Sequence, residues 1–199
     1  EGAARAPVAI VVGGGNIMRG AAHKEGAIDP TRADYMGMLA TLFNGLALKD
    51  AIERRGARCE VVAPHAVPNV AHGYDRARVM AWLADGVVVV FAGGTGHPFF
   101  TTDTCAALRA AEIGAAELLK GSKVDGIYTA DPKKDPNAKR FERLTYDQAI
   151  AGRYAVMDAA AWPLCQEQNV AIRVFDMTAA GTIAAALGPN PPGTLVSRG

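Results

Sequence analysis

The sequence is poor in cysteine, has almost no net charge and contains no long apolar run. Its 21 Lys and Arg nearly balance 20 Asp and Glu, so no basic excess points to nucleic acid or an anionic membrane. No apolar run reaches membrane-spanning length, and the first residues lack the charged-then-apolar order of a signal peptide. The three cysteines, Cys59, Cys105 and Cys165, are widely separated in apolar or helical contexts, which favours reduced structural thiols over disulfide, metal or nucleophile roles. These absences predict a cytoplasmic protein with neither a membrane nor a nucleic-acid partner.

Short apolar strands alternate with helical patterns along the chain, which predicts an α/β fold with a mainly parallel sheet sandwiched between helices. With 199 residues, half of them hydrophobic, the chain suits a single domain over residues 1–199. The expected strands are Val8–Val12, Cys59–Ala63, Val87–Ala92, Glu117–Lys120 and Ala171–Phe175, with an edge strand at Thr194–Val196. The expected helices are one from Asp34 to about Arg54, then Asp75–Leu83, Asp103–Ile113, Thr145–Ala151, Asp158–Gln168 and Thr182–Leu187. In the first helix, Leu39, Leu42, Phe43 and Leu46 recur at the spacing of an apolar helix face.

Two of the expected strands run into glycine-rich turns. Val8–Val12 is followed by Gly13, Gly14 and Gly15, and Val87–Ala92 by Gly93, Gly94 and Gly96. Such turns bring backbone N–H groups close to a ligand, and a helix start capped by Thr102 or Asp103 would add a positive helix end. Two of them on one sheet suggest two phosphate-bearing ligands side by side, as phosphoryl transfer requires.

The first turn fits neither the dinucleotide fingerprint G-x-G-x-x-G nor the P-loop G-x-x-x-x-G-K-[ST]. It does place Arg19 four residues after its last glycine. A guanidinium is a planar fork suited to phosphate oxygens, so we interpret Arg19 as a phosphate contact in preference to a solvated surface arginine. There is no convincing His or Cys catalytic arrangement.

Five segments of the chain together resemble the bacterial uridylate kinases, which are UMP kinases of the amino-acid kinase superfamily. They are GGGNIMRG at Gly13–Gly20, DYMGMLAT at Asp34–Thr41, GTGHPFFTTD at Gly94–Asp103, KVDGIYTADP at Lys123–Pro132 and VMD at Val156–Asp158. The resemblance runs from about Val8 to the end of the chain. It implies the amino-acid kinase fold and transfer of the γ-phosphoryl group of ATP to UMP in pyrimidine nucleotide synthesis.

The resemblance also implies roles for individual residues. UMP would be bound by Gly14, Asp34, Thr95, Gly96, His97, Pro98, Phe99, Phe100, Thr101 and Thr102. ATP would be bound by Gly15, Arg19, Lys120, Ser122, Lys123, Tyr128 and Asp131. The catalytic residues would be Arg19, Asp103 and Asp158, with the two carboxylates ordering the magnesium or a catalytic lysine. Four of these have plainer alternatives, since Asp34 or Asp103 could be only a helix cap and Lys120 or Lys123 only a surface residue.

Magnesium is expected to arrive with ATP, and no metal site made by the protein alone is expected. The implied partners are UMP and ATP, a homohexamer built from dimers, and GTP or UTP as effectors. A general base is not required, because the second pKa of a phosphate lies near ~6 and the acceptor oxygen is already largely deprotonated.

The sequence departs from the family pattern at two places. His97 stands where asparagine is expected, and the family's first strand, with its Lys-x-Ser-Gly motif, is not among the 199 residues. We expect a UMP kinase whose given sequence is an N-terminally truncated copy. The alternatives are a carboxylate or carbamate kinase of the same superfamily and a non-catalytic nucleotide-binding or oxyanion-storing relative that lost its lysine.

Overall fold

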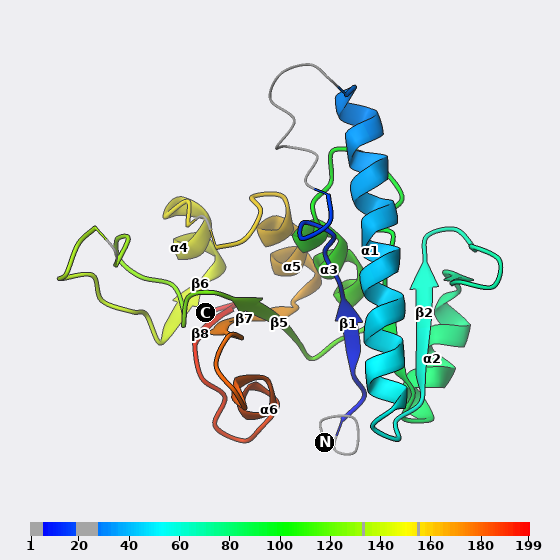
Figure 1. Ribbon diagram of the computed structural model, residues 1–199. Coiled ribbons are helices and arrows are strands. Elements are labelled where there is room, and N and C mark those ends of the chain that lie inside the picture. The colour runs from blue at the N-terminus through cyan, green and yellow to red at the C-terminus, as the bar shows by residue number, and fades with distance from the viewer. Residues whose placement is uncertain (1–5, 19–27, 133, 155) are drawn as a thin grey trace. The chain divides into compact units, whose positions relative to one another are not determined.

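A computed structural model describes residues 6–18, 28–132, 134–154 and 156–199 (Figure 1). The chain divides into two compact units, Glu1–Cys105 and Ala106–Gly199, with the boundary inside helix α3 (Thr102–Ile113). The expectation of a single domain over residues 1–199 stays a prediction.

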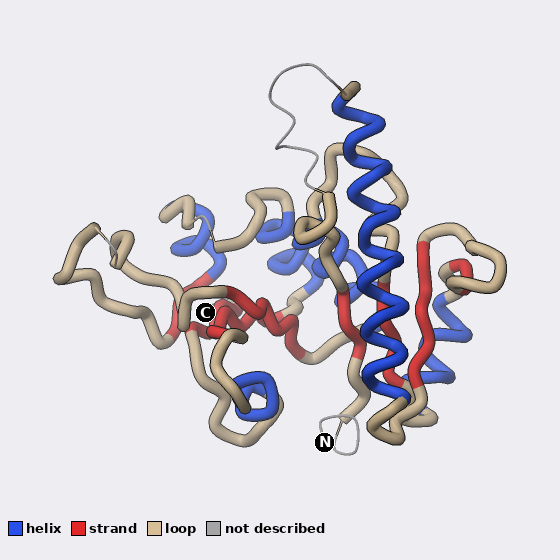
Figure 2. Tube along the Cα trace, viewed as in Figure 1, coloured by secondary structure: helices blue, strands red, loops and turns tan. Residues whose placement is uncertain are grey.

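The first unit is built on a parallel sheet with the strand order β1-β4-β2-β3. Its strands are β1 (Ala9–Val11), β2 (Cys59–Ala63), β3 (His72–Gly73) and β4 (Val88–Phe91), and its helices are α1 (Pro30–Glu53) and α2 (Arg76–Ala84). Helix α1 packs on β2 and β4 and runs alongside the strands in Figure 2. Strands β2 and β4 are buried on both faces, as the unbroken apolar runs predicted.

Helix α1 begins four residues before the predicted start at Asp34. Asp29 is its N-cap and accepts a hydrogen bond from Arg32 N at 3.1 Å, and Pro30 occupies the first turn. Asp34 is therefore inside the helix, and its alternative role as an N-cap is wrong.

The apolar stripe predicted on α1 is mostly not its buried face. Leu39, Phe43 and Leu46 are 57%, 68% and 40% exposed, and only Leu42 is buried. The side that packs on the sheet carries small residues. At Gly45, an added Cβ would lie only 3.1 Å from the Cβ of Ala92, so a larger side chain does not fit there. The helix therefore packs its small residues against the sheet, which allows a closer approach than the large side chains would.

The second unit has a mixed sheet with the order β5-β7-β8-β6. Its strands are β5 (Glu117–Ser122), β6 (Arg143–Thr145), β7 (Ala171–Asp176) and β8 (Thr194–Ser197), and its helices besides α3 are α4 (Tyr146–Ala151), α5 (Ala161–Gln168) and α6 (Thr182–Ala186). The β5–β7 and β6–β8 pairs are parallel, while β7 and β8 are antiparallel. The predicted α/β fold class is confirmed.

Two predictions in the second unit are wrong in detail. Thr194–Val196 was expected at a sheet edge, but β8 lies between β7 and β6, because the short strand β6 pairs along its outer side. Thr194 is fully buried there, accepting from Ile127 N at 2.9 Å and donating to Phe141 O at 2.5 Å. The helix expected from Asp158 begins at Ala161.

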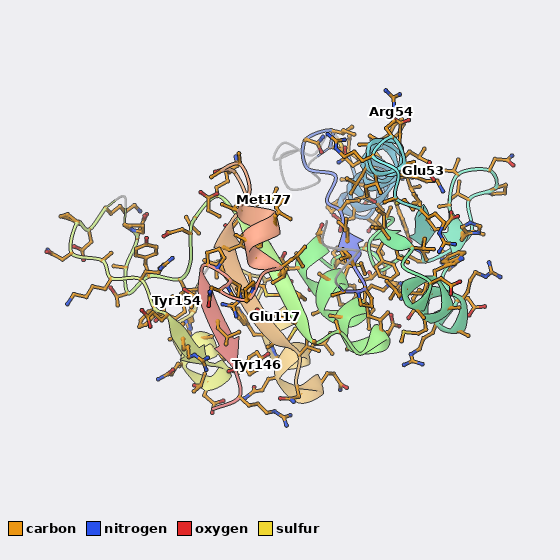
Figure 3. All side chains as sticks on the ribbon, turned by 90° about the horizontal axis from the view of Figure 1, so that it is seen from below. Glu53, Arg54, Glu117, Tyr146, Tyr154 and Met177 are labelled. Carbon is orange, nitrogen blue, oxygen red and sulfur yellow. The ribbon has the colours of Figure 1, made fainter. Side chains whose placement is uncertain are left out.

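Side chains from α4, α5 and the strands form the core of the second unit. Tyr146, labelled in Figure 3, is 1% exposed and its hydroxyl donates to Val170 O. Trp162, Ile172 and Val174 lie in the same cluster.

In the described ranges, no helix combines the length and hydropathy that a bilayer crossing would need.

The three cysteines, all within the described residues, are buried and form no disulfide. Burial raises the pKa of the Cys59 and Cys165 thiols to about 11. At pH 8 only about one such thiol in a thousand is ionised. We expect both thiols to react with a disulfide reagent at least about a hundredfold more slowly in the native protein than in the urea-unfolded chain. Mass spectrometry of labelled peptides measures this, and rapid native labelling of Cys59 would place it outside the core.

Candidate active site

The two glycine-rich turns lie at the same edge of the first unit's sheet. Strands β1 and β4 are adjacent and parallel, with Val11 opposite Phe91, and Val12 N donates to Phe91 O at 3.2 Å. Because the carboxyl ends of parallel neighbours meet at one edge, the turns that follow these strands are neighbours. The prediction that both turns lie on one sheet is confirmed, and this edge is where ligands bind in open parallel sheets.

Helix α1 holds the first turn from one side. Gly14 is buried against it so closely that a Cβ would lie 2.6 Å from Gly37 O and 2.9 Å from the Cβ of Ala40. Asn44 Nδ2 donates to Gly13 O at 2.6 Å and to Asn16 Oδ1 at 2.7 Å. The turn is thus fixed by packing at Gly14 and by a side-chain amide at the glycine before it.

The same helix also holds the second turn. Thr41 Oγ1 accepts a hydrogen bond from Gly93 N at 2.5 Å and donates to Met38 O at 2.6 Å. Gly93 has φ +80°, and a Cβ there would lie 2.9 Å from Pro64 Cδ, so this position requires glycine. Residues on one helix therefore anchor both turns.

Asp34 joins α1 to the segment that follows the second turn. Its Oδ2 accepts a hydrogen bond from Phe99 N at 2.8 Å, while Oδ1 makes no hydrogen bond with the described residues. Phe99 has φ +68°, a left-handed conformation that costs about 1–3 kcal/mol in a non-glycine residue. The carboxylate compensates part of that cost and keeps one oxygen available for a ligand.

The segment Thr95–Thr102, which the sequence predicted to bind UMP, is an open loop at this edge as far as Thr101, and Thr102 begins α3. Phe99 and Phe100 are 76% and 56% exposed, so two large aromatic rings face solvent beside Asp34. Thr95 Oγ1 accepts from His97 N at 3.2 Å, which closes a tight turn around Gly96. Thr101 Oγ1 accepts from Thr104 N at 3.3 Å, so Thr101 caps α3 and the predicted cap at Thr102 or Asp103 is wrong.

Most of the residues predicted to bind ATP lie in the second unit. Lys120 and Ser122 are at the carboxyl end of β5, and Lys123 follows in the turn. The Tyr128 hydroxyl donates to Asp125 Oδ1 at 2.7 Å, and this hydrogen bond raises the Tyr128 pKa. Asp131 O accepts from the N–H groups of Lys134 and Asp135, both at 2.9 Å, which shapes the loop after Tyr128.

The predicted catalytic residues are only partly placed. Arg19 lies outside the described residues. Asp103 is in the first turn of α3, in the first unit. Asp158 is in the turn before α5, in the second unit, where its carbonyl accepts from Ala161 N at 3.0 Å. Their roles stay predictions.

Three polar residues at these sites were not found from the sequence. Thr41 and Asn44 are on α1, where a count of polar positions at helical spacing (34, 41 and 44) could have found them. Asp176 ends β7 directly opposite Ser122, and hydrogen bonds from Thr178 lower its pKa. It is a carboxylate at the carboxyl end of a strand, which is a usual signal for a site.

Comparison with known proteins agrees with this geometry. Residues 2–176 match the profile of the Amino acid kinase family. The chain is 48% identical over 192 residues to the uridylate kinase of Pseudomonas aeruginosa strain PAO1, an alignment that covers 96% of this chain and 78% of that protein. This chain belongs to the uridylate kinases of the amino acid kinase family.

Solved structures of uridylate kinases have the same fold as this chain. The UMP kinase of Ureaplasma parvum superposes with a TM-score of 0.93 at 39% identity, covering 98% of this chain and 84% of that one. The UMP kinase of Bacillus anthracis superposes with a TM-score of 0.92 at 35% identity, covering 96% and 79%. The resemblance to uridylate kinases inferred from the five motifs is confirmed, and with it the assignment of the chain as a kinase.

Two glycines in contact at the first turn give a matched pair of variants. Gly14→Ala places a methyl group against the backbone of α1 and should destabilise the protein by about 1–3 kcal/mol. Gly37→Ala adds a methyl group to the same helix where nothing lies within 4 Å, and should stabilise it by up to about 1 kcal/mol. Urea unfolding measures both, and equal effects of the two substitutions would contradict the close contact.

Proposed function

We propose that this uridylate kinase transfers the γ-phosphoryl group of ATP to UMP, giving UDP and ADP. The observation that carries the proposal is the pair of glycine turns at adjacent strand ends, with the Asp34 carboxylate beside them. In the reaction an oxygen of the UMP phosphate forms a bond to the γ-phosphorus, and the bond from that phosphorus to the β,γ-bridging oxygen breaks. The acceptor oxygen is already deprotonated, so positioning and charge neutralisation supply the catalysis.

The proposed UMP site is the edge of the first unit. Gly14 and the loop Thr95–Thr102 would surround the phosphate and the base, and the available oxygen of Asp34 would accept a ribose hydroxyl. A carboxylate with one oxygen tied to the backbone suits this task, because its orientation is set before the ligand arrives. His97 is exposed in that loop.

In the second unit, the proposed contacts to ATP are made by Lys120, Ser122, Lys123, Tyr128 and Asp131. Gly15 and Arg19 keep the ATP-binding roles that the resemblance to uridylate kinases implies. Asp103 in the first unit and Asp158 in the second are each proposed to order the magnesium that accompanies ATP, or a catalytic lysine. Among the described residues there is no cluster of three or more His, Cys, Asp or Glu side chains that could hold a metal. A single carboxylate together with phosphate oxygens is nevertheless a usual set of magnesium ligands, so either residue by itself fits the ion, which would neutralise phosphate charge.

The other functions considered from the sequence are less well supported. A carboxylate or carbamate kinase, or a non-catalytic relative, would not be expected to share 48% identity with a uridylate kinase over 96% of the chain. Both remain outcomes of the test that follows.

An acceptor panel tests the proposed function directly. The chain should be assayed as the 199 residues and together with any residues its gene encodes before Glu1. With ATP and magnesium, ADP release should be at least about tenfold faster with UMP than with CMP, AMP, aspartate or carbamate. Comparable rates on aspartate or carbamate would contradict a nucleotide acceptor. UMP binding without turnover by either version would favour the non-catalytic relative.

We also propose that the protein is a cytoplasmic homohexamer of the pyrimidine pathway, with GTP and UTP as effectors. Support for self-association comes from a row of exposed apolar residues on α1. The row consists of Tyr35, Met36, Leu39, Phe43 and Leu46, each between 40% and 68% exposed. An apolar row of this length on one helix is typical of a surface that another protein covers, and a second copy of the same helix would match it.

Phe43 is the most exposed member of the row and gives the sharpest test of self-association. Phe43→Glu should halve or further reduce the assembly size measured by light scattering, because it would bury an unpaired charge at the interface. Arg54→Glu at the exposed end of α1, labelled in Figure 3, is the control and should leave the assembly unchanged. A parent protein that is monomeric at micromolar concentration would contradict the proposal.

A further inference from the structure

Helix α1 presents three polar side chains that bond to the two glycine turns and the loop after them. Asp34, Thr41 and Asn44 are spaced by seven and three residues, which places them along one side of the helix. Each bonds to backbone of a segment beyond α1, at Phe99 N, Gly93 N and Gly13 O respectively. Asp34 and Thr41 accept from N–H groups of these segments, whereas Asn44 donates to a carbonyl.

Holding the Gly13 carbonyl fixes the direction of the next N–H group. A peptide unit is planar and trans, so its C=O and N–H point in opposite directions. Asn44 Nδ2 draws Gly13 O toward α1 at 2.6 Å, and the Gly14 N–H therefore points away from the helix. That N–H has no acceptor among the described residues, although Gly14 itself is buried. An N–H that has no protein acceptor and is aimed away from its own scaffold is suited to an anion.

The Asn44 amide is itself held in one orientation. Its Nδ2 donates to Asn16 Oδ1 at 2.7 Å, and Asn16 Nδ2 donates back to Asn44 Oδ1 at 3.2 Å. This reciprocal pair fixes which end of the amide faces Gly13. Asn16 is more exposed than Asn44 and makes no contact with Gly13 O among the described residues, so the pair and the carbonyl contact can be broken separately.

We propose that Asn44 is a positioning residue for phosphoryl transfer, which aims the Gly14 N–H at an oxygen of the acceptor phosphate through its bond to Gly13 O. This inference rests on the proposed function, because it takes the ligand at this edge to be UMP. Asn44 touches neither substrate in this account. Its effect passes through one peptide unit, and a misplacement of about 1 Å at such a unit can cost on the order of a hundredfold in rate.

The test compares three substitutions with a control on the same helix. Asn44→Asp keeps the shape but loses both donated hydrogen bonds, Asn44→Ala removes the amide without adding charge, and Asn16→Ala breaks only the reciprocal pair. Asp50→Asn alters an exposed ion pair with Arg54 far from the turns and serves as the control. Each variant is assayed for kcat and KM in UDP formation, for UMP affinity by calorimetry and for thermal stability.

Both Asn44 variants should lower kcat/KM for UMP at least about thirtyfold and weaken UMP binding, while KM for ATP changes less than about threefold. Asn16→Ala should stay within about threefold of the parent, and Asp50→Asn should match it. An Asn44→Asp variant with parental kinetics would overturn the proposal, because shape alone would then suffice. Equal losses in Asn16→Ala and Asn44→Ala would also overturn it, since the amide pair would then be only a brace for the turn.

Failure of the proposed function gives a different result from failure of this inference. A parent that binds UMP but makes no UDP removes the kinase function and leaves the calorimetric comparison of the same variants to decide the role of Asn44. A parent that neither binds nor phosphorylates UMP overturns both. A variant that loses UMP binding together with its cooperative thermal transition is unfolded, and in that case the remaining Asn44 variant, compared with Asn16→Ala, decides the question.

Discussion

The close approach of α1 to the sheet is the constraint on which the proposed site depends. Gly14 lies against Gly37 O and Ala40, and Gly45 against Ala92, at distances that exclude any added methyl group without displacement. At this separation the side chains of Thr41 and Asn44 reach backbone in both glycine turns. A wider spacing would leave these groups unpaired, at about 1–3 kcal/mol for each that is buried.

The same approach explains why large apolar residues of α1 face away from the sheet. Leu39 and Phe43 cannot fit between the helix and β2 or β4, so they remain exposed and become available to a second copy of the chain. One helix thus supplies the support of the acceptor site on one side and the proposed self-association surface on the other. Substitutions on either side can be made without touching the other.

The sequence predicted the strands and the two glycine turns well, because unbroken β-branched runs and glycine clusters are local signals. It did not predict which side of α1 is buried, since the apolar period favours leucines and phenylalanine over the small residues that the sheet requires. The helical spacing of positions 34, 41 and 44 could have pointed to Thr41 and Asn44, but not to the backbone groups they bond, because the target of a helical side chain depends on the partner strand. The strand at Arg143–Thr145 is too short for a pattern, and without it β8 was expected at an edge.

Hydrogen exchange with and without UMP tests most directly whether one helix and two turns form the acceptor site. Saturating UMP should slow exchange together in peptides that cover residues 13–16, 34–44 and 93–101, because the turns and α1 are joined by the bonds at Gly13, Gly93 and Phe99. Peptides from β6 and β8 should not change. Protection confined to the second unit, or present at only one of the two turns, would contradict the account.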